Sequence, residues 1–263
     1  MDEVAIVIPV RMKSSRLPGK PLAEIDSMSV VEHVWRNVIA VYDPKHVYVA
    51  YDCNEIADVV QKFGGNGIAT DENHPSGTDR IAEAMRKIKN PVAGKDYKTV
   101  VNFQGDGLNV DPRLNNKLIE IMAENNADIV TVATQISGAE DINNPAMVKI
   151  AMNNKGRALY FSRSPIPYDR DNNSVTKAFW HIGIYVYNVK SLQKFVEYPE
   201  GDLEKLEKLE QLRALENNML IYASVVQSIK LLNDVPADIN TPEELAEAQK
   251  HFTRSKVEKV LKI

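Results

Sequence analysis

The segment that decides the fold runs from Val4 to Leu22 and reads VAIVIPVRMKSSRLPGKPL. Its first part, Val4–Val10, is apolar and rich in β-branched side chains, which is typical of a strand buried on both faces. Polar and basic residues begin at Arg11. In open parallel sheets, ligands bind beyond the carboxyl ends of the strands. The segment therefore predicts a buried first strand that opens into a ligand-binding loop.

Downstream of this segment, strand-like and helix-like patterns alternate. Strands are expected at His46–Tyr51, Thr99–Phe103 and Ile129–Ala133, and helices at Val31–Val41, Glu55–Phe63, Ile81–Ile88 and Asn115–Ala123. This order predicts an α/β fold with a mainly parallel central sheet and right-handed crossovers.

The second half of the chain has a different pattern. Further strands are expected at Met147–Met152, Ile182–Tyr187 and Leu220–Val226, with the first two separated by a long loop that carries RALYFSRSPIPYDRD. Residues Leu203–Leu215 predict one helix with leucine at every third position, which is typical of a packing stripe. Thr-Pro-Glu-Glu at Thr241 predicts the start of a last helix. The basic tail from Phe252 is expected to fray.

Composition limits the classes of function. The 263 residues suit one large α/β domain or two small ones. With 32 basic against 36 acidic residues, there is no general attraction for nucleic acid or anionic membranes. The single cysteine, Cys53, excludes an intramolecular disulfide and a cysteine-based zinc site. The start, MDEVAIVIPV, lacks the positive charge of a signal peptide, and no apolar stretch reaches the roughly 18 residues of a membrane span. We expect a soluble cytoplasmic protein.

The loop after the first strand is a candidate phosphate site. Four cations fall within ten residues, with two serines and a glycine among them: Arg11, Lys13, Arg16 and Lys20, with Ser14, Ser15 and Gly19. Backbone amides surrounded by such cations can bind a triphosphate. The alternative is a solvated basic loop. The position after a buried strand, together with Pro18-Gly19, favours phosphate binding.

Three further motifs carry polar groups. In NFQGDGLN, Asp106 follows a predicted strand and can hold a magnesium ion, although Gly-Asp-Gly is also a common turn. In HPSGTDR, Ser76, Gly77 and Thr78 can face a base or cap a helix, and the cap is favoured locally. His181 and Tyr185 are expected on one face of a strand, near Arg157 and Arg163. This grouping suggests a carboxylate-binding pocket, and the alternative is a hydrogen-bonded structural histidine.

A nicotinamide site is disfavoured. The sequence KFGGNG follows a predicted helix rather than a strand, so it indicates a helix end. No G-x-G-x-x-G opens the chain, which counts against an NAD-dependent enzyme.

These motifs together resemble the CMP-Kdo synthetases (3-deoxy-manno-octulosonate cytidylyltransferases). The resemblance covers about Val4 to about Ala246 and rests on IPVRMKSSRLPGKPL, HPSGTDR, NFQGDG, NPAMVK, ALYFSRSPIPYDRD, HIGIYVY, LEKLEQLR and NTPEEL, in the family's order. It implies a Rossmann-like nucleotidyltransferase fold, with residues 1–263 as a single cytidylyltransferase domain. It also implies a smaller acceptor-binding and dimerisation subregion at approximately 145–217, and a homodimer.

The resemblance also implies roles for particular residues. The nucleotide would be bound by Arg11, Ser14, Arg16, Lys20, Ser76, Gly77 and Arg163. The acceptor would be bound by Arg80, Gln104, His181, Tyr185, Glu210 and Gln211. Magnesium would be held by Asp106 and Asn240, and catalysis would rest on Arg16, Lys20 and Asp106.

The sequence departs from the family in two places. Gly107 and Leu108 stand where the family has Glu and Pro in Q-G-D-E-P. Asn240 stands where the family's D-T-P-E motif has its second metal aspartate, and Asp238 or Asp234 could supply the missing carboxylate.

The expected activity is direct, in-line transfer of CMP from CTP to a Kdo-like sugar acid in lipopolysaccharide biosynthesis, with release of pyrophosphate. Two alternatives stay open besides the disfavoured NAD-dependent enzyme. The first is the same chemistry on another acidic acceptor, such as an amino-Kdo, a different 2-keto sugar acid or a phosphonate. The second is a non-catalytic nucleotide-binding protein.

Overall fold

The chain forms two compact units, which are described one at a time. The computed structural model describes residues 2–13, 16–136, 142–170, 178–227, 231–232 and 238–262. Unit 1 comprises Met1–Leu114 and Ile229–Ile263, and unit 2 comprises Asn115–Ser228. Unit 2 contains the subregion at approximately 145–217 that the sequence indicates as acceptor-binding.

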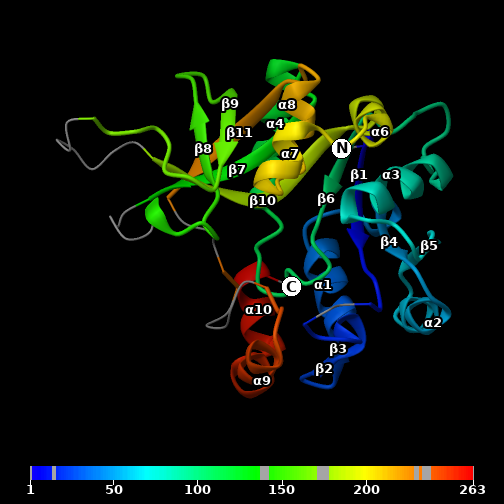
Figure 1. The fold of residues 1–263 in the computed structure, drawn as a ribbon. Coiled ribbons are helices and arrows are strands. Elements are labelled where there is room, and N and C mark those ends of the chain that lie inside the picture. Colours follow the sequence, from blue (N-terminus) through cyan, green and yellow to red (C-terminus); the bar gives the residue numbers. More distant parts are fainter. Residues whose placement is uncertain are drawn as a thin grey trace. The chain divides into compact units, whose positions relative to one another are not determined.

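Unit 1 is built on parallel strands. These are β1 (Val4–Pro9), β4 (Val47–Tyr51), β5 (Asn66–Ala69) and β6 (Thr99–Asn102), in the spatial order β6-β1-β4-β5. β1 lies between two parallel neighbours, which explains why Val4–Ile8 are buried and uniformly apolar (Figure 1). The parallel sheet predicted from the first strand is thereby confirmed.

Helices pack against this sheet. They are α1 (Val30–Ile39), α2 (Asn54–Lys62) and α3 (Gly77–Lys87), with the short 3-10 helices η1 (Lys20–Leu22) and η2 (Pro44–His46). α1 begins where the Ser29 hydroxyl accepts from the amide of Glu32. Before it lies a hairpin that the sequence analysis missed, β2 (Glu24–Ile25) and β3 (Met28–Ser29).

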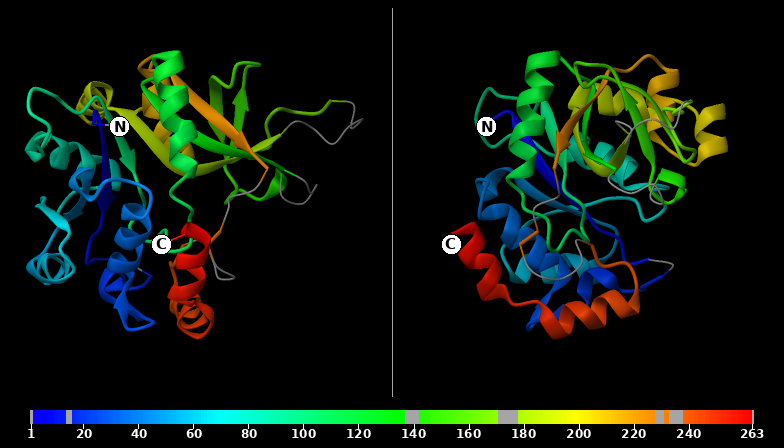
Figure 2. Two further views of the ribbon diagram at one scale, coloured as in Figure 1. Left: turned by 180° about the vertical axis from the view of Figure 1, so that it is seen from behind. Right: turned by 90° about the vertical axis from the view of Figure 1, so that its left-hand side faces the viewer.

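The C-terminal part of unit 1 contains two helices. α9 (Pro242–His251) starts at Thr241, as predicted, and the structure adds a capping box in which Thr241 and Glu244 bond each other's amides. The predicted fraying from Phe252 is wrong, because α10 (Arg254–Leu261) follows, and Val257 and Leu261 are buried in an apolar core. Figure 2 shows this helix pair in red.

Unit 2 has a mixed sheet. β7 (Ile129–Gln135) pairs in parallel with β11 (Ile221–Val226) and antiparallel with β10 (Phe179–Asn188). β8 (Lys149–Met152) pairs antiparallel with β10 and with β9 (Ala158–Ser162). β9 lies inside the stretch that was expected to be a long loop, so that expectation is wrong for residues 158–162.

The helices of unit 2 also differ from the prediction. They are α4 (Leu114–Asn125), which starts at the unit boundary, α6 (Val189–Glu197), α7 (Asp202–Glu207) and α8 (Gln211–Glu216). The single helix expected over Leu203–Leu215 is broken at Lys208, which has a φ of 52°. Leu206 is consequently 81% exposed while Leu212 is buried, so the leucines do not form one continuous packing stripe.

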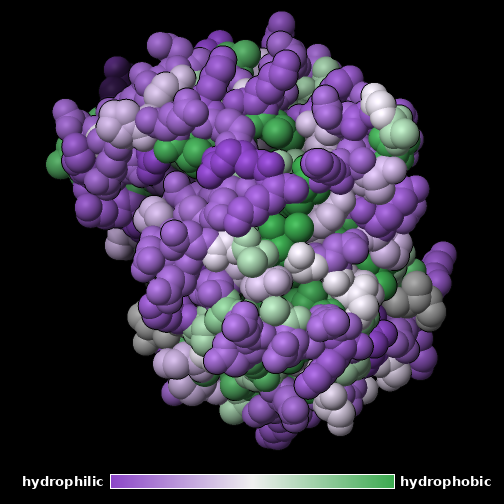
Figure 3. Space-filling model, turned by 90° about the vertical axis from the view of Figure 1, so that its right-hand side faces the viewer, coloured by the Kyte–Doolittle hydropathy of each residue, from purple (hydrophilic) through white to green (hydrophobic). Residues whose placement is uncertain are grey.

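The surface is largely polar where Figure 3 shows it, with apolar residues exposed in smaller groups. Across the described ranges, no helix combines the length and the apolar character needed to cross a bilayer.

Candidate active site

Unit 1 contains a cavity of about 240 Å³ at the carboxyl ends of β1 and β6. Its lining brings together most residues that the sequence indicates for nucleotide, acceptor and metal: Arg11, Arg16, Lys20, Ser76, Gly77, Arg80, Gln104, Asp106 and Asn240. Ser14 lies outside the described residues. The cavity lies beyond the carboxyl ends of parallel strands, which is where open α/β sheets bind their ligands.

The two loops that form the cavity approach each other closely at Gly105. A Cβ atom at this position would lie 2.5 Å from the Pro9 carbonyl oxygen and 2.6 Å from a methyl group of Val10. Only glycine therefore allows the segment after β6 to pass the end of β1. Gly105 thus places Asp106 beside the loop that carries the cations.

Opposite charges meet at the centre of the cavity. Lys20 Nζ donates to Asp106 Oδ2 at 2.6 Å and to Asn240 Oδ1 at 3.4 Å. Arg16 Nη2 donates to the same Asn240 oxygen at 3.2 Å. The pair of Lys20 and Asp106 is mostly shielded, with side chains 15% and 23% exposed, so solvent screens it only in part. Arg16 and Lys20 donate to the same Asn240 oxygen, so an anionic ligand in the cavity would lie near two cations.

The oxygens around Lys20 fit magnesium chemistry. Asp106 and Asn240 both contact the Lys20 ammonium, so a carboxylate and an amide oxygen lie around one cationic position. Within the described part of the chain no cluster of three or more His, Cys, Asp or Glu side chains could hold a metal by itself. Magnesium keeps several waters and is commonly held by one or two carboxylates together with substrate phosphates, so this sparse set suits it.

A further carboxylate lies near this set. Asp238 is exposed to solvent, yet its pKa is raised by partial desolvation and then by the negative charge of Asp106. Asp234, the other candidate for a second carboxylate, lies outside the described residues.

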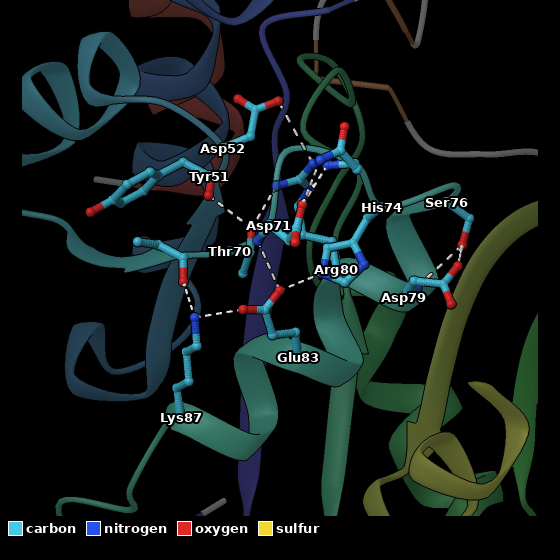
Figure 4. A network of polar contacts seen from close by, with 12 residues as sticks. Tyr51, Asp52, Thr70, Asp71, His74, Ser76, Asp79, Arg80, Glu83 and Lys87 are labelled. Carbon is cyan, nitrogen blue, oxygen red and sulfur yellow. Dashed lines mark hydrogen bonds and ion pairs between the residues drawn. The ribbon is translucent and has the colours of Figure 1, made fainter. Parts of the chain in front are cut away.

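Arg80 forms one wall of the cavity and is 2% exposed. Figure 4 shows its guanidinium between two strand ends: Nη1 donates to Thr70 Oγ1 at 2.5 Å, and Nη2 lies 3.7 Å from Asp52. Nη2 has no hydrogen-bond acceptor within the described part of the chain. Asp52 also accepts from the amide of Met12 at 3.0 Å, which ties the wall to the cation-rich loop.

The HPSGTDR segment caps α3 and lines the cavity at the same time. The Ser76 hydroxyl accepts from the amides of Thr78 and Asp79, so the expected cap is confirmed. Behind it, Glu83 accepts from His74 and Lys87 (Figure 4). Burial alone would raise the pKa of Glu83, but hydrogen bonds from Lys87, from a backbone amide and from His74 lower it to about 2. The segment is therefore anchored from both ends.

Unit 2 brings His181 and Tyr185 together. A bulge in β10 between Ile182 and Tyr185 interrupts the regular alternation, yet the two rings lie 5.5 Å apart. The Thr131 hydroxyl lies 2.8 Å from the Ile184 carbonyl oxygen, to which it can donate, and 3.0 Å from His181 Nε2. Burial lowers the pKa of His181 to about 3, so its imidazole is neutral at pH 7.

The arginines expected beside this pair have other contacts. The Arg163 guanidinium donates to the backbone carbonyls of Glu207, Pro145 and Lys208, at 2.7, 3.0 and 3.3 Å. Arg157 precedes β9 and pairs with Tyr222 through the backbone. The remaining predicted acceptor residues, Glu210 and Gln211, lie at the start of α8.

Sequence reasoning missed Asp52 and Thr70. Each directly follows a parallel strand, β4 and β5 respectively. The rule that singled out Arg11 and Asp106 at the ends of β1 and β6 applies equally to them, so the position after each strand was the available signal.

A parallel sheet whose first strand opens into a cation-rich loop, facing an aspartate beyond a neighbouring strand, defines a nucleotidyltransferase type of site. The family model described as cytidylyltransferase matches residues 5–221. The chain belongs to this cytidylyltransferase family.

Named relatives are similar over nearly their whole length. The 3-deoxy-manno-octulosonate cytidylyltransferase of Paramagnetospirillum magneticum is 42% identical over 249 residues, covering 92% of this chain and 97% of the relative. The enzyme of the same name from Thermodesulfovibrio yellowstonii is 41% identical, covering 90% and 95%. A solved structure of CMP:2-keto-3-deoxy-manno-octonic acid synthetase complexed with CTP matches with a TM-score of 0.83 at 36% identity, covering 94% and 97%. The Rossmann-like nucleotidyltransferase fold expected from the sequence is confirmed.

Proposed function

We propose that the protein transfers CMP from CTP to a Kdo-type 3-deoxy-2-keto sugar acid and releases pyrophosphate. The observation that carries the proposal is the convergence of Arg16, Lys20, Asp106 and Asn240 on one cavity. The similarity to a synthetase complexed with CTP and to the named cytidylyltransferases supports this pair of substrates.

The reaction is a direct displacement at the α-phosphorus of CTP. An acceptor hydroxyl oxygen forms a bond to this phosphorus, the bond to the β-phosphate oxygen breaks, and the hydroxyl proton passes to water. Arg16 and Lys20 orient the triphosphate and neutralise the charge that develops on the leaving pyrophosphate. Asp106 keeps Lys20 in place through their ion pair.

Magnesium is the proposed cofactor, and Asp106 and Asn240 are the residues that would hold it. When bound, it stabilises negative charge on the phosphate oxygens. Asn240 brings no charge of its own, so Asp106 supplies the anionic ligand among these two residues.

The acceptor is proposed to contact Arg80 and Gln104, which line the same cavity. Among the described residues, Arg80 Nη2 is a buried charged donor without a hydrogen-bond acceptor, which suits a carboxylate. In unit 2, the proposed acceptor-binding residues are His181, Tyr185, Glu210 and Gln211, and Arg163 is proposed to bind the nucleotide or the acceptor carboxylate. A homodimer, a cytoplasmic location and a role in lipopolysaccharide biosynthesis are proposed with this activity.

Pyrophosphate release tests the function. The protein is mixed with CTP, magnesium and one acceptor at a time: Kdo, an amino-Kdo, another 2-keto sugar acid or a phosphonate. We expect pyrophosphate with Kdo or a close analogue. Release with the phosphonate alone would assign another acceptor class, and CTP binding without release for any acceptor would indicate a non-catalytic nucleotide-binding protein.

A further inference from the structure

An apolar core beneath α9 and α10 anchors three segments of the active site. Its buried members include neighbours of the central polar residues: Leu17, which follows Arg16; Leu108, two residues after Asp106; and Ile239, which precedes Asn240. Phe252, Val257 and Leu261 of the C-terminal helices belong to the same core. The C-terminal helix pair therefore packs directly beneath the segments that carry the phosphate and metal residues.

A buried chain of hydrogen bonds crosses this core. It starts at Arg254, the first residue of α10, which is 7% exposed. Arg254 Nη1 donates to Asn37 Oδ1, and Asn37 Nδ2 donates to the carbonyl oxygen of Leu108 at 2.8 Å. Asn37 is fully buried on α1. The backbone amide of Arg254 donates to Asp26 at 3.1 Å, which fixes the start of α10.

The chemistry of these groups permits only one orientation of Asn37. A guanidinium carries only donors and a backbone carbonyl only accepts, so the Asn37 oxygen must face Arg254 and its amide nitrogen must face Leu108. Without Arg254, the Asn37 oxygen would be left unsatisfied in an apolar core, and its orientation would no longer be imposed.

The series of hydrogen bonds that starts at Arg254 ends at Leu108, and the backbone of Leu108 is bonded to Asp106. The Asp106 carbonyl accepts from the amide of Leu108 at 2.8 Å and from the amide of Ile239 at 3.4 Å. A displacement of Leu108 therefore moves the turn that presents the Asp106 carboxylate, and also its link to the segment that carries Asn240.

We propose that Arg254 is a positioning residue, which fixes the Asp106 carboxylate through Asn37 and the Leu108 carbonyl. The proposal rests on the proposed function, because it assigns to Asp106 the role of anionic metal ligand. A guanidinium on the C-terminal helix thus sets the geometry of a site that it does not touch.

Two variants break the chain at different links. Arg254→Met keeps much of the side-chain volume and removes the donor to Asn37. Asn37→Asp keeps an acceptor for Arg254, so the buried pair is retained, but it removes the donor to Leu108. Two further variants are controls. Lys259→Met removes an exposed charge from α10. Ile56→Val, on α2, lowers stability by creating a small cavity away from the hydrogen bonds of Arg254 and Asn37.

CTP binding is measured by calorimetry with and without magnesium, alongside kcat, KM and Tm. In the wild type, magnesium should raise the affinity for CTP, and we expect Arg254→Met and Asn37→Asp to lose this gain. Their kcat should fall by about tenfold to a hundredfold, as for a misplaced catalytic group. CTP affinity without magnesium should fall less than CTP affinity with magnesium, because the Arg16 and Lys20 side chains are still present in both variants. The two controls should keep the magnesium effect at any Tm they show.

The outcomes separate the two proposals. Arg254→Met and Asn37→Asp variants that keep the magnesium effect and kcat, with only a lower Tm, overturn the positioning role. Wild-type protein that binds no CTP in the presence of magnesium overturns the proposed function itself, and the positioning role with it. If Arg254→Met does not fold, the positioning role is tested with Asn37→Asp and Arg254→Lys instead. Arg254→Lys keeps a donor to Asn37, so it should keep part of the magnesium effect.

Discussion

At the scale of single residues, the cations of the loop after β1 differ in their contacts and in their exposure to solvent. Lys20 contacts both Asp106 and Asn240, whereas Arg16 contacts Asn240 and is exposed. Lys13, in the same loop, pairs with Glu72 on the surface and is 77% exposed. Position in the loop therefore does not by itself indicate a role in binding.

Lys20→Ala and Arg16→Ala should each impair the use of CTP while leaving the fold intact. A charge-assisted hydrogen bond in a partly desolvated site contributes about 1.5–3 kcal/mol, so kcat/KM for CTP should fall by roughly tenfold or more, with the larger loss at Lys20. Lys13→Ala is the matched control from the same loop. Kinetics at limiting CTP test this, and equal values for all three variants and wild type would show that the loop is a solvated surface.

Asp106 and Asn240 should respond oppositely to a change of charge. Asp106→Asn removes the anionic member of the pair and should abolish turnover. Asn240→Asp adds an anion beside Arg16 and Lys20, so it should be tolerated and should lower the magnesium midpoint. Activity is measured against magnesium concentration for wild type and both variants. Near-normal turnover of Asp106→Asn at the wild-type midpoint would mean that Asp106 is not the metal ligand.

At the scale of secondary structure, the buried parallel strands were predictable because burial on both faces leaves an uninterrupted apolar run. The elements that were missed lack such a local signal. β9 does not alternate regularly, because Phe161 and Ser162 are both buried while Leu159 is exposed, and α10 depends on the core beneath it. The break at Lys208 is a backbone conformation of a single residue, which hydrophobic periodicity cannot reveal.

The candidate site was predictable from the sequence only where its residues lie close to the ends of apolar strands. Residues directly after apolar strands, such as Arg11 and Asp106, stand out in the sequence. Asn37 and Arg254 act over a long separation in the chain, and neither lies in a motif. Only the packing of α10 against α1 brings them together, so sequence patterns could not indicate them.

The bulged strand β10 makes a testable contribution to the pH dependence of stability. His181 has a pKa of about 3 in the folded protein, against about 6.5 when exposed to solvent. The unfolded chain therefore binds one more proton between these values, so stability is complete above about pH 6.5 and declines as the pH falls toward 3.

His181→Gln should remove this contribution. The free energy of unfolding of the variant should change less steeply with pH between 3 and 6.5, by up to about 1.4 kcal/mol per pH unit. His251→Gln, at an exposed position at the end of α9, is the control. Urea unfolding across this range supplies the measurement, and identical slopes for wild type and His181→Gln would refute a buried, neutral imidazole.

At the scale of the whole molecule, several cations are concentrated at one cavity although the net charge is negative. The chain has a net charge of −4, yet Arg11, Arg16, Lys20 and Arg80 line a single cavity. A low overall charge avoids general attraction for polyanions, while the local cluster attracts a small, highly charged anion. This distribution suits a nucleoside triphosphate better than a nucleic acid.

Binding of CTP should therefore protect unit 1 in a defined pattern. A ligand that binds only the folded state stabilises it by about 2.7 kcal/mol at a hundredfold excess over Kd, and local opening of the contacted segments is suppressed with it. Hydrogen exchange with CTP and magnesium should slow at the residues that line the cavity, namely 10, 11, 16, 20, 76, 77, 80, 104–106 and 240. Protection at Arg163 of unit 2 would support its proposed contact with the nucleotide.

The comparison of nucleotides decides the base preference. ATP, GTP and UTP carry the same triphosphate, so they can engage Arg16 and Lys20, but we expect weaker protection because the proposed contacts at Ser76 and Gly77 depend on cytosine. The Lys20→Ala variant controls for the phosphate contribution and should lose protection with every nucleotide. Equal or greater protection by ATP, GTP or UTP at the same concentration would contradict CTP as the preferred donor, because the segment near the base would then not discriminate.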